Sequence, residues 1–302
     1  MSIDLKAAES FLARHARLLD RRRYEFLIGA APPEAVLAAV DGYRNPDGGY
    51  GWGLEPDLRA PESQPGGALH AFEVFAEIGP RTTPRAAQLC DWLETITLPD
   101  GGLPFAVPVA DDSGCAPFWA QADPAVSTLH STAFVTGVAL RVAAHDRAVA
   151  GHRWTGRAVE YCLARIDALD AAPHAIELSF AVRFLDELAA TRPDAADRID
   201  RLRRFFPDDG IVPVAGGSPG EVLRPLDFSP LPGRPSRGLF RPEVVEAEVD
   251  RLESTQHDDG GWSVDFASYS PAAELEWRGY ATVGAIATLR ANGRLTRAAV
   301  AG

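Results

Sequence analysis

The chain has 302 residues, of which 46% are hydrophobic and 24% charged, and its formal net charge is −12. A chain of this length buries roughly 75% of the surface that its unfolded form exposes, so its core needs no disulfide or metal ion to hold it. The excess of acidic residues repels polyphosphates, and long runs of Lys or Arg are missing, so nucleic acid is not an expected partner.

The cysteines and the apolar stretches point to a cytoplasmic protein. The three cysteines are widely spaced, at Cys90, Cys115 and Cys162. An odd number without a Cys-x-x-Cys pair is typical of a reducing compartment. Charged side chains run through residues 1–27, which therefore do not resemble a secretory signal. The longest apolar stretch, 132–144, is too short to span a membrane and contains Arg141.

The predicted helices come in pairs along the chain. The first helix of each pair opens with a proline, which suits a first helical turn. We predict these first helices over 33–40, 84–95, 193–206 and 242–255. The second helices are more apolar and are predicted over 67–78, 125–144 and 272–292, the last stopped by Gly293. Residues 156–169 and 174–190 are predicted to form a further helical hairpin.

An Asp-Gly-Gly sequence recurs in the loops between the helices, roughly every 50 residues or a multiple of that step. Its copies lie at Asp47, Asp100 and Asp259, and a shorter Asp-Gly copy lies at Asp209. Glycine reaches positive φ without a steric cost, and an aspartate side chain accepts backbone N–H bonds in such turns. We therefore predict that these aspartates form tight turns and are not catalytic. In the copy at 256–262 we expect the Gln256 amide to bond to a neighbouring helix end and the Trp262 indole to pack between repeats.

The copy from Gln256 to Trp262 resembles the QW-type motif of the squalene cyclase and protein prenyltransferase repeat superfamily. The copies at Asp47 and Asp100 are similar to it, and so are residues 62–69 and 123–133, which resemble the openings of the family's inner helices. The resemblance spans about residues 42–293. It implies an all-α fold, an α/α-toroid of about five to six helical hairpins that alternate as outer and inner helices around a central cavity. Residues 1–302 would form one such domain, a single barrel.

The sequence departs from that family where the family's chemistry lies. The Asp-x-Asp-Asp protonation motif does not occur, and neither does the Asp-x-Cys and distant His set that holds zinc in protein prenyltransferases. The Asp-Asp-x-x-Asp magnesium motif of other terpene synthases is missing too. The family's catalytic acid therefore has no counterpart here. We expect no metal site and no cofactor, with Mg²⁺ needed only if the substrate is a diphosphate.

Candidate acids are the carboxylates near the inner-helix openings, because in a toroid these openings face one mouth of the barrel. They are Glu55, Asp57, Glu62, Asp265 and Glu276. Carboxylates at helix N-termini also cap free N–H groups and interact favourably with the helix dipole, so a structural role is the alternative.

Candidate substrate-binding residues are aromatic side chains and histidines of the same regions. They are Trp52, His70, Phe105, Trp119, His130, Phe228, Tyr269 and Trp277. Aromatic faces stabilise cations, and imidazole titrates near neutral pH. The alternatives are packing of repeat against repeat for the rings and hydrogen-bonded core positions for His70 and His130.

One proline-rich stretch, 216–242, interrupts the repeat where an inner helix is expected. Long loops without secondary structure are often functional covers. If this one lies over the barrel mouth, Arg234 and Arg237 are placed to clamp a diphosphate or carboxylate. The alternative is an irregular, solvated loop.

Two functions follow as hypotheses. In the first, the protein is terpenoid cyclase-like or prenyltransferase-like and encloses an isoprenoid or similar hydrophobic substrate in an aromatic cavity, with acid assistance from a carboxylate. In the second, it is a non-catalytic toroid that binds a hydrophobic small molecule or a protein. In neither do we expect a nucleic-acid partner or a transmembrane segment.

Overall fold

The computed structural model describes residues 3–295, and this part of the chain is mainly helical. It contains fourteen α-helices, and its strands are limited to two short antiparallel pairs. The prediction of a helical protein is therefore confirmed. The chain divides into two compact units: unit 1 takes the residues up to Ala39 and those from Phe206 onward, and unit 2 takes Val40–Phe205.

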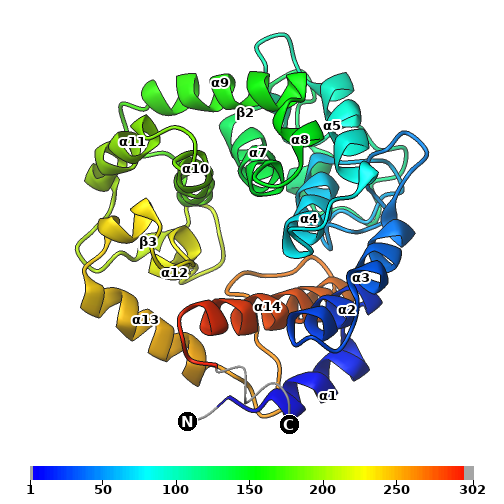
Figure 1. Ribbon diagram of the computed structural model, residues 1–302, viewed down its shortest axis with the longest axis vertical. Helices are drawn as coiled ribbons and strands as arrows, with labels where there is room; N and C mark the ends of the chain where they lie inside the picture. The colour runs from blue at the N-terminus through cyan, green and yellow to red at the C-terminus, as the bar shows by residue number, and fades with distance from the viewer. Residues whose placement is uncertain (1–2, 296–302) are drawn as a thin grey trace. The chain divides into compact units, whose positions relative to one another are not determined.

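Unit 2 contains three helical pairs arranged in two layers (Figure 1). Its helices are α4 (Pro65–Glu77), α5 (Pro84–Ile96), α6 (Pro117–Ala120), α7 (Leu129–Ala143), α8 (Arg147–Ala150), α9 (Arg153–Asp167), α10 (Ala175–Leu188) and α11 (Asp194–Leu202). In the inner layer, α4 and α10 both pack against α7. Each inner helix also packs against an outer one, α4 against α5, α7 against α9 and α10 against α11. Strand β1 (Leu103–Pro104) pairs with β2 (Ser127–Thr128), with Leu103 opposite Thr128.

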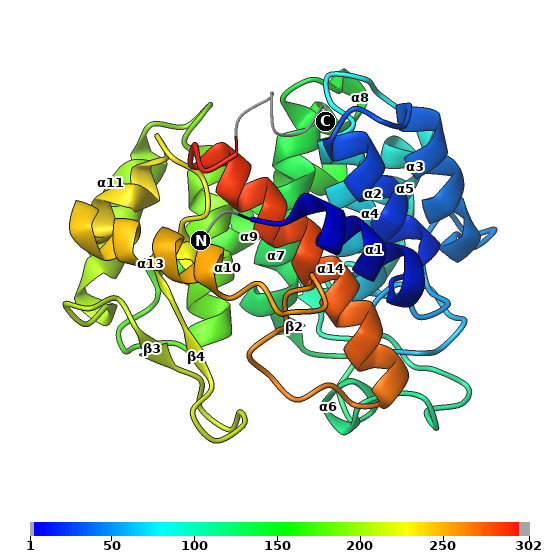
Figure 2. The ribbon, with the colours of Figure 1, turned by 90° about the horizontal axis from the view of Figure 1, so that it is seen from below.

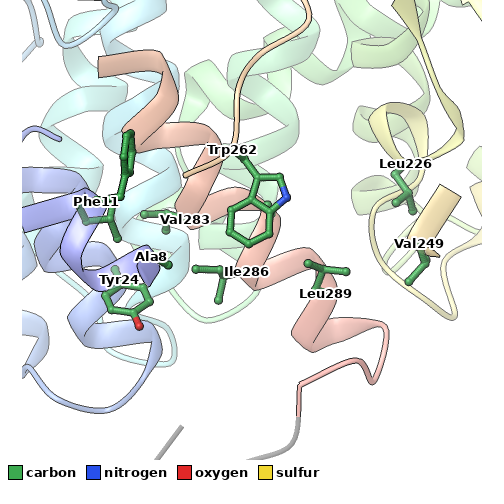
Figure 3. Packing of buried hydrophobic residues seen from close by; sticks show 11 residues of the cluster. Ala8, Phe11, Tyr24, Leu226, Val249, Trp262, Val283, Ile286 and Leu289 are labelled. Carbon is green, nitrogen blue, oxygen red and sulfur yellow. The ribbon is translucent and has the colours of Figure 1, made fainter. Parts of the chain in front are cut away.

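Unit 1 is built around one long helix. Its elements are α1 (Leu5–His15), α2 (Leu18–Leu27), α3 (Pro33–Val40), β3 (Val212–Pro213), β4 (Val222–Leu223), α12 (Pro225–Phe228), α13 (Pro242–Ser254) and α14 (Pro271–Ala291). The long helix α14 packs against both α1 and α2 (Figure 2), although the sequence analysis predicted neither of these two helices. In the core between them, the Trp262 indole lies beside Ile286, and Phe11 comes from α1 (Figure 3).

Most predicted helix boundaries agree with the structure to within a few residues, because capping residues determine them locally. The Ser270 hydroxyl accepts a bond from the N–H of Ala273 at the start of α14, and Gly293 follows its end with a φ of 79°. The start of α7 was predicted four residues too early. Ser127 and Thr128 pair with β1 as a strand, so the backbone just before the helix is extended and not helical. The Thr128 hydroxyl then caps the start of the helix.

The stretch predicted as an irregular loop, 216–242, contains short elements. They are β4, α12 and a 3₁₀ helix at Pro235–Leu239. Proline stands at the first or second position of both helices, which fits its preset φ. An inner helix of full length is replaced here by two single turns.

The Asp-Gly-Gly copies form the predicted turns. The first glycine has a positive φ in each copy, 90° at Gly48, 95° at Gly101 and 94° at Gly260. In each copy the aspartate side chain accepts a bond from the N–H two residues later, at 2.9 Å for Asp47, 3.1 Å for Asp100 and 3.0 Å for Asp259. Each aspartate also accepts a bond from a side chain near the next inner helix, Ser63, Ser127 or Arg278. The aspartates therefore have a structural role, because each one links its own turn to the helix that follows.

Gln256, at the last Asp-Gly-Gly turn, bonds to the start of α1. Gln256 Nε2 donates to the carbonyl oxygens of Asp4 and Gly260, both at 2.9 Å, and Gln256 Oε1 accepts from the Asp4 N–H at 2.9 Å. Asp4 is the N-cap of α1. The Trp262 indole donates to the Leu252 carbonyl at 2.9 Å. The expected contact between the Gln256 amide and a neighbouring helix end is confirmed.

We expect the substitution Gln256→Ala to lower the free energy of unfolding by about 1–3 kcal/mol, because it removes two hydrogen bonds that join the last turn to Asp4 at the start of α1 and one within the turn, to Gly260. Urea unfolding measures this. The matched control is Gln121→Ala, an exposed position where we expect a change within about 0.5 kcal/mol. Equal effects of the two substitutions would show that the Gln256 contacts do not stabilise the protein.

Candidate functional site

A buried histidine between two carboxylates lies at the start of the inner layer of unit 2. His70 and Glu73 are one helical turn apart on α4, and Glu55 comes from the preceding loop. His70 Nδ1 lies 3.0 Å from Glu73 Oε2, and His70 Nε2 lies 3.0 Å from Glu55 Oε2. The three side chains are only 5–10% exposed. Both ring nitrogens of His70 are therefore engaged by carboxylates away from water.

This arrangement holds His70 in its charged form. Burial by itself lowers the pKa of His70, but the hydrogen bonds and charges of Glu55 and Glu73 outweigh it and raise the pKa to about 9. At neutral pH the imidazolium therefore donates a hydrogen bond to each carboxylate. With both carboxylates ionised, the cluster carries one net negative charge inside the unit.

Asp57 lies next to this cluster. Its backbone N–H donates to Glu55 Oε1 at 3.2 Å, and its side chain is buried, with 4% of the residue exposed. The Asp57 carbonyl accepts from the Ala116 N–H at 2.8 Å, which ties this loop to the segment before α6. Two of the predicted acids, Glu55 and Asp57, are thus brought together with His70.

Glycine lets the helix approach this loop closely. A Cβ atom at Gly66 would lie 3.3 Å from the Glu55 side chain and 3.5 Å from the Trp119 ring. A Cβ at Gly67 would lie 2.2 Å from the Tyr50 carbonyl oxygen, so any larger residue there is excluded. The Gly66 position therefore places Trp119 beside the carboxylate cluster.

Trp119 belongs to a cluster of aromatic rings. Its ring stacks on Phe105 with centroids 4.3 Å apart, and the His130 ring meets Phe105 edge to face at 5.0 Å. Phe134 of α7 and Phe180 of α10 both contact His130. Burial, and secondarily the charge of His174, lowers the pKa of His130 to about 3, so its imidazole is neutral at physiological pH. Three predicted substrate-binding residues thus form one apolar wall.

Two further predicted residues of unit 2 lie outside these clusters. Glu62 Oε1 accepts a bond from the Ala110 N–H at 3.1 Å, and Glu62 lines a cavity of about 580 Å³. The Trp52 side chain is 59% exposed, with a φ of 58°, and its indole donates to Asn45 Oδ1 at 2.7 Å.

In unit 1, the predicted residues of the 216–242 stretch take part in local structure. Phe228 is fully buried against Phe206 and Phe240. Arg237 donates to the carbonyl oxygens of Leu231 and Pro230 and to Asn292 Oδ1, at 2.8–3.1 Å. Arg234 is half-buried at the start of the 3₁₀ helix. The Arg237 guanidinium is therefore occupied by contacts that shape the loop.

The remaining predicted residues gather near the start of α14. The Trp277 ring meets Phe266 edge to face at 5.2 Å and Tyr280 at 5.6 Å. Glu276 is half-buried, Asp265 is exposed, and Tyr269 is 45% exposed. These side chains belong to unit 1, and the His70 cluster belongs to unit 2.

The sequence analysis did not name Glu73, Phe134 or Phe180 as site residues. A signal for Glu73 was present, because a carboxylate three positions after a histidine on a helix lies on the same face. No such signal existed for Phe180, whose contact with His130 depends on the packing of α10 against α7.

Comparisons with known proteins do not place the chain in a family. The chain matches no protein-family model, and no curated protein is significantly similar to it. Within residues 3–295, no group of three His, Cys, Asp or Glu side chains is arranged to hold a metal ion. Of the helices in the described part of the chain, none combines the length and the apolar character that crossing a membrane requires.

Proposed function

We propose that the protein binds an isoprenoid or similar hydrophobic small molecule against the Phe105–Trp119–His130 wall and promotes its reaction through a cationic intermediate. The observation that carries this proposal is that Glu55 and Trp119 both lie close to Gly66, so that the buried carboxylate–imidazolium cluster is near the aromatic rings. Ring faces and a desolvated carboxylate both stabilise developing positive charge. Apolar walls with a few convergent polar groups are typical of small-molecule sites.

The proposed roles follow from the hydrogen bonds. Both oxygens of Glu55 accept hydrogen bonds, from His70 and from the Asp57 N–H, and in this proposal Glu55 stabilises the cation. Asp57, in its protonated form, would then give its proton to a carbon–carbon double bond. Loss of a proton from the product cation back to a carboxylate closes the cycle, so no further reactant is needed.

We propose in addition that the helical pairs belong to an α/α-toroid, and that the chain is a single-barrel relative of the squalene cyclase and prenyltransferase repeat superfamily that works in the cytoplasm. Three alternating helix pairs in unit 2 and the recurring turns support the toroid. The bonds of Gln256 to Asp4 support it too, because they connect the last repeat to the first helix. All three cysteines are unpaired thiols, which supports a reducing compartment such as the cytoplasm.

Turnover tests the enzyme proposal. The purified protein is incubated with geranyl, farnesyl and geranylgeranyl diphosphates and with squalene, with and without Mg²⁺, and products are measured by gas chromatography and mass spectrometry. We expect product from at least one substrate. Asp57→Asn should lower the rate by about 10²–10⁴, the contribution of a general acid. The control Asp259→Asn alters a turn of unit 1 and should keep the rate while lowering stability.

The second candidate function is binding without catalysis. The exposed ring of Phe118, 59% accessible and in contact with Trp119, favours it, because an open aromatic edge suits a ligand that is held and released. Mass spectrometry of organic extracts that shows a bound lipid, together with no product from any of the four substrates, would contradict the enzyme proposal and support this one.

A further inference from the structure

His130, in the aromatic wall of unit 2, has no hydrogen-bond partner among residues 3–295. It is the second residue of α7. Three phenylalanine rings contact its imidazole, with centroids at 5.0 Å for Phe105, 5.4 Å for Phe134 and 5.1 Å for Phe180. Phe105, His130 and Phe180 are each half-buried, so part of this wall is open and the imidazole remains within reach of a ligand.

The His130 imidazole offers one donor and one acceptor to a ligand. Burial lowers its pKa to about 3, so the ring is neutral at physiological pH. A neutral imidazole has one N–H group that donates and one nitrogen that accepts. Polar atoms in apolar surroundings are destabilising unless they form hydrogen bonds. A hydroxyl group both donates and accepts, and it is therefore the simplest ligand group that matches this ring.

The charges near the wall disfavour an anionic ligand. The His70 imidazolium donates its two N–H groups to Glu55 and Glu73, at 3.0 Å each. Its positive charge is therefore compensated inside the cluster, which is negative overall when both carboxylates are ionised. Phosphate groups are recognised mainly by Arg and Lys, whose charge offsets theirs, and the neutral His130 supplies no such charge. An uncharged head group fits the wall better than a diphosphate.

We propose that the ligand of the Phe105–Trp119–His130 wall is an isoprenoid alcohol, whose hydroxyl group hydrogen-bonds to the His130 imidazole while its chain packs along the aromatic rings. This inference rests on the proposed function, because it takes the wall as the site of the isoprenoid. It fits the proposed first step, since protonation of a carbon–carbon double bond needs no diphosphate leaving group. His130 is then the residue that selects the head group.

The test compares three ligands on the full-length protein by isothermal titration calorimetry. They are geraniol, its hydrocarbon analogue in which a methyl group replaces the hydroxymethyl group, and geranyl diphosphate. A purely apolar site binds the hydrocarbon more tightly than the alcohol, because the hydroxyl group must leave water. We expect the opposite order, with geraniol bound about tenfold more tightly than the hydrocarbon, the effect of one hydrogen bond. Geranyl diphosphate should bind more weakly than geraniol.

The variant His130→Phe keeps an aromatic ring in the wall and removes both ring nitrogens. We expect it to bind geraniol about tenfold more weakly than the wild type does, without weaker binding of the hydrocarbon. The matched control is His257→Phe, which changes an exposed histidine of unit 1 and should leave the affinity for all three ligands unchanged.

Three outcomes would overturn this inference and leave the proposed function standing: a hydrocarbon bound as tightly as geraniol, geranyl diphosphate bound more tightly than geraniol, or a preference for geraniol that persists in His130→Phe. Binding of none of the three ligands would overturn both, since the wall would then take no isoprenoid chain. The comparison of ligands uses the wild type, so it stays valid if His130→Phe fails to fold.

Discussion

Replacing His70 with glutamine is expected to lower the free energy of unfolding by about 3–5 kcal/mol at pH 7, because the variant leaves buried carboxylates without their shared positive partner. His70 is bonded to Glu55 and Glu73 at 3.0 Å each, and the side chains are at most 10% exposed. Glutamine is uncharged and cannot donate to both carboxylates along opposite directions. Urea unfolding followed by circular dichroism measures the loss.

The contribution of His70 to the free energy of unfolding depends on pH in a defined direction. The pKa of His70 is raised in the folded protein from 6.5 to about 9. The stabilisation is therefore complete below pH 6.5 and is lost as the pH rises through about 9, and the shift is equivalent to about 3 kcal/mol. The difference in unfolding free energy between the wild type and His70→Gln should shrink over this range. Burial also raises the pKa of the Cys90 and Cys162 thiols, but both proteins contain them, so their effect cancels in the difference.

The matched control is His257→Gln, an exposed histidine that bonds to Ser263. We expect a change within about 0.5 kcal/mol, without a pH-dependent difference from the wild type over the same range. If the His70→Gln difference stayed constant between pH 6.5 and 9, the two carboxylates would not be holding the imidazolium, and the electrostatic account of the site would be wrong.

Replacing Trp262 with alanine is expected to lower the free energy of unfolding by about 3–5 kcal/mol, the range for a large aromatic side chain removed from a packed core. The residue is 2% exposed, and its indole packs in the cluster with Phe11 and Ile286 (Figure 3). Its ring N–H also donates to the Leu252 carbonyl, and alanine removes this bond, although the carbonyl keeps the one from the Thr255 hydroxyl. Urea unfolding measures this loss as well.

The matched control is Trp52→Ala, the tryptophan that follows the first Asp-Gly-Gly turn; the position that corresponds to Trp262 there is Tyr50. Its side chain is 59% exposed and makes one hydrogen bond, to Asn45, so we expect a loss of at most about 1 kcal/mol. Similar losses of unfolding free energy for Trp262→Ala and Trp52→Ala would show that packing of Trp262 does not stabilise the core between α1 and α14. The comparison separates a buried tryptophan from an exposed one.

The repeated turns were predictable because their cause is local. Glycine at a positive φ and an aspartate two residues before the N–H that it binds act within one turn, and Gly48, Gly101 and Gly260 all follow this rule. The start of α14 was predictable for the same reason, since a serine cap and a proline specify it. The start of α7 was not, because its boundary depends on the pairing of Ser127 with Pro104, a contact between residues distant in the sequence.

In the candidate site, too, some features could be predicted from the sequence and others depend on contacts between distant residues. The sequence analysis named Glu55, Asp57, His70 and Trp119 one by one as candidates, from their places in the toroid that the family resemblance implies. Only the packed structure brought His70 within 3.0 Å of Glu55 and placed Glu62 apart from them, at an open surface depression. The sequence by itself determined the recurring turns and most helices from residue 33 onward, since these depend on neighbouring residues, but it did not reveal α1 or α2. The tertiary structure decided which carboxylates are buried and which two of them bind the His70 imidazolium, because desolvation and charge pairing depend on groups that only folding brings together.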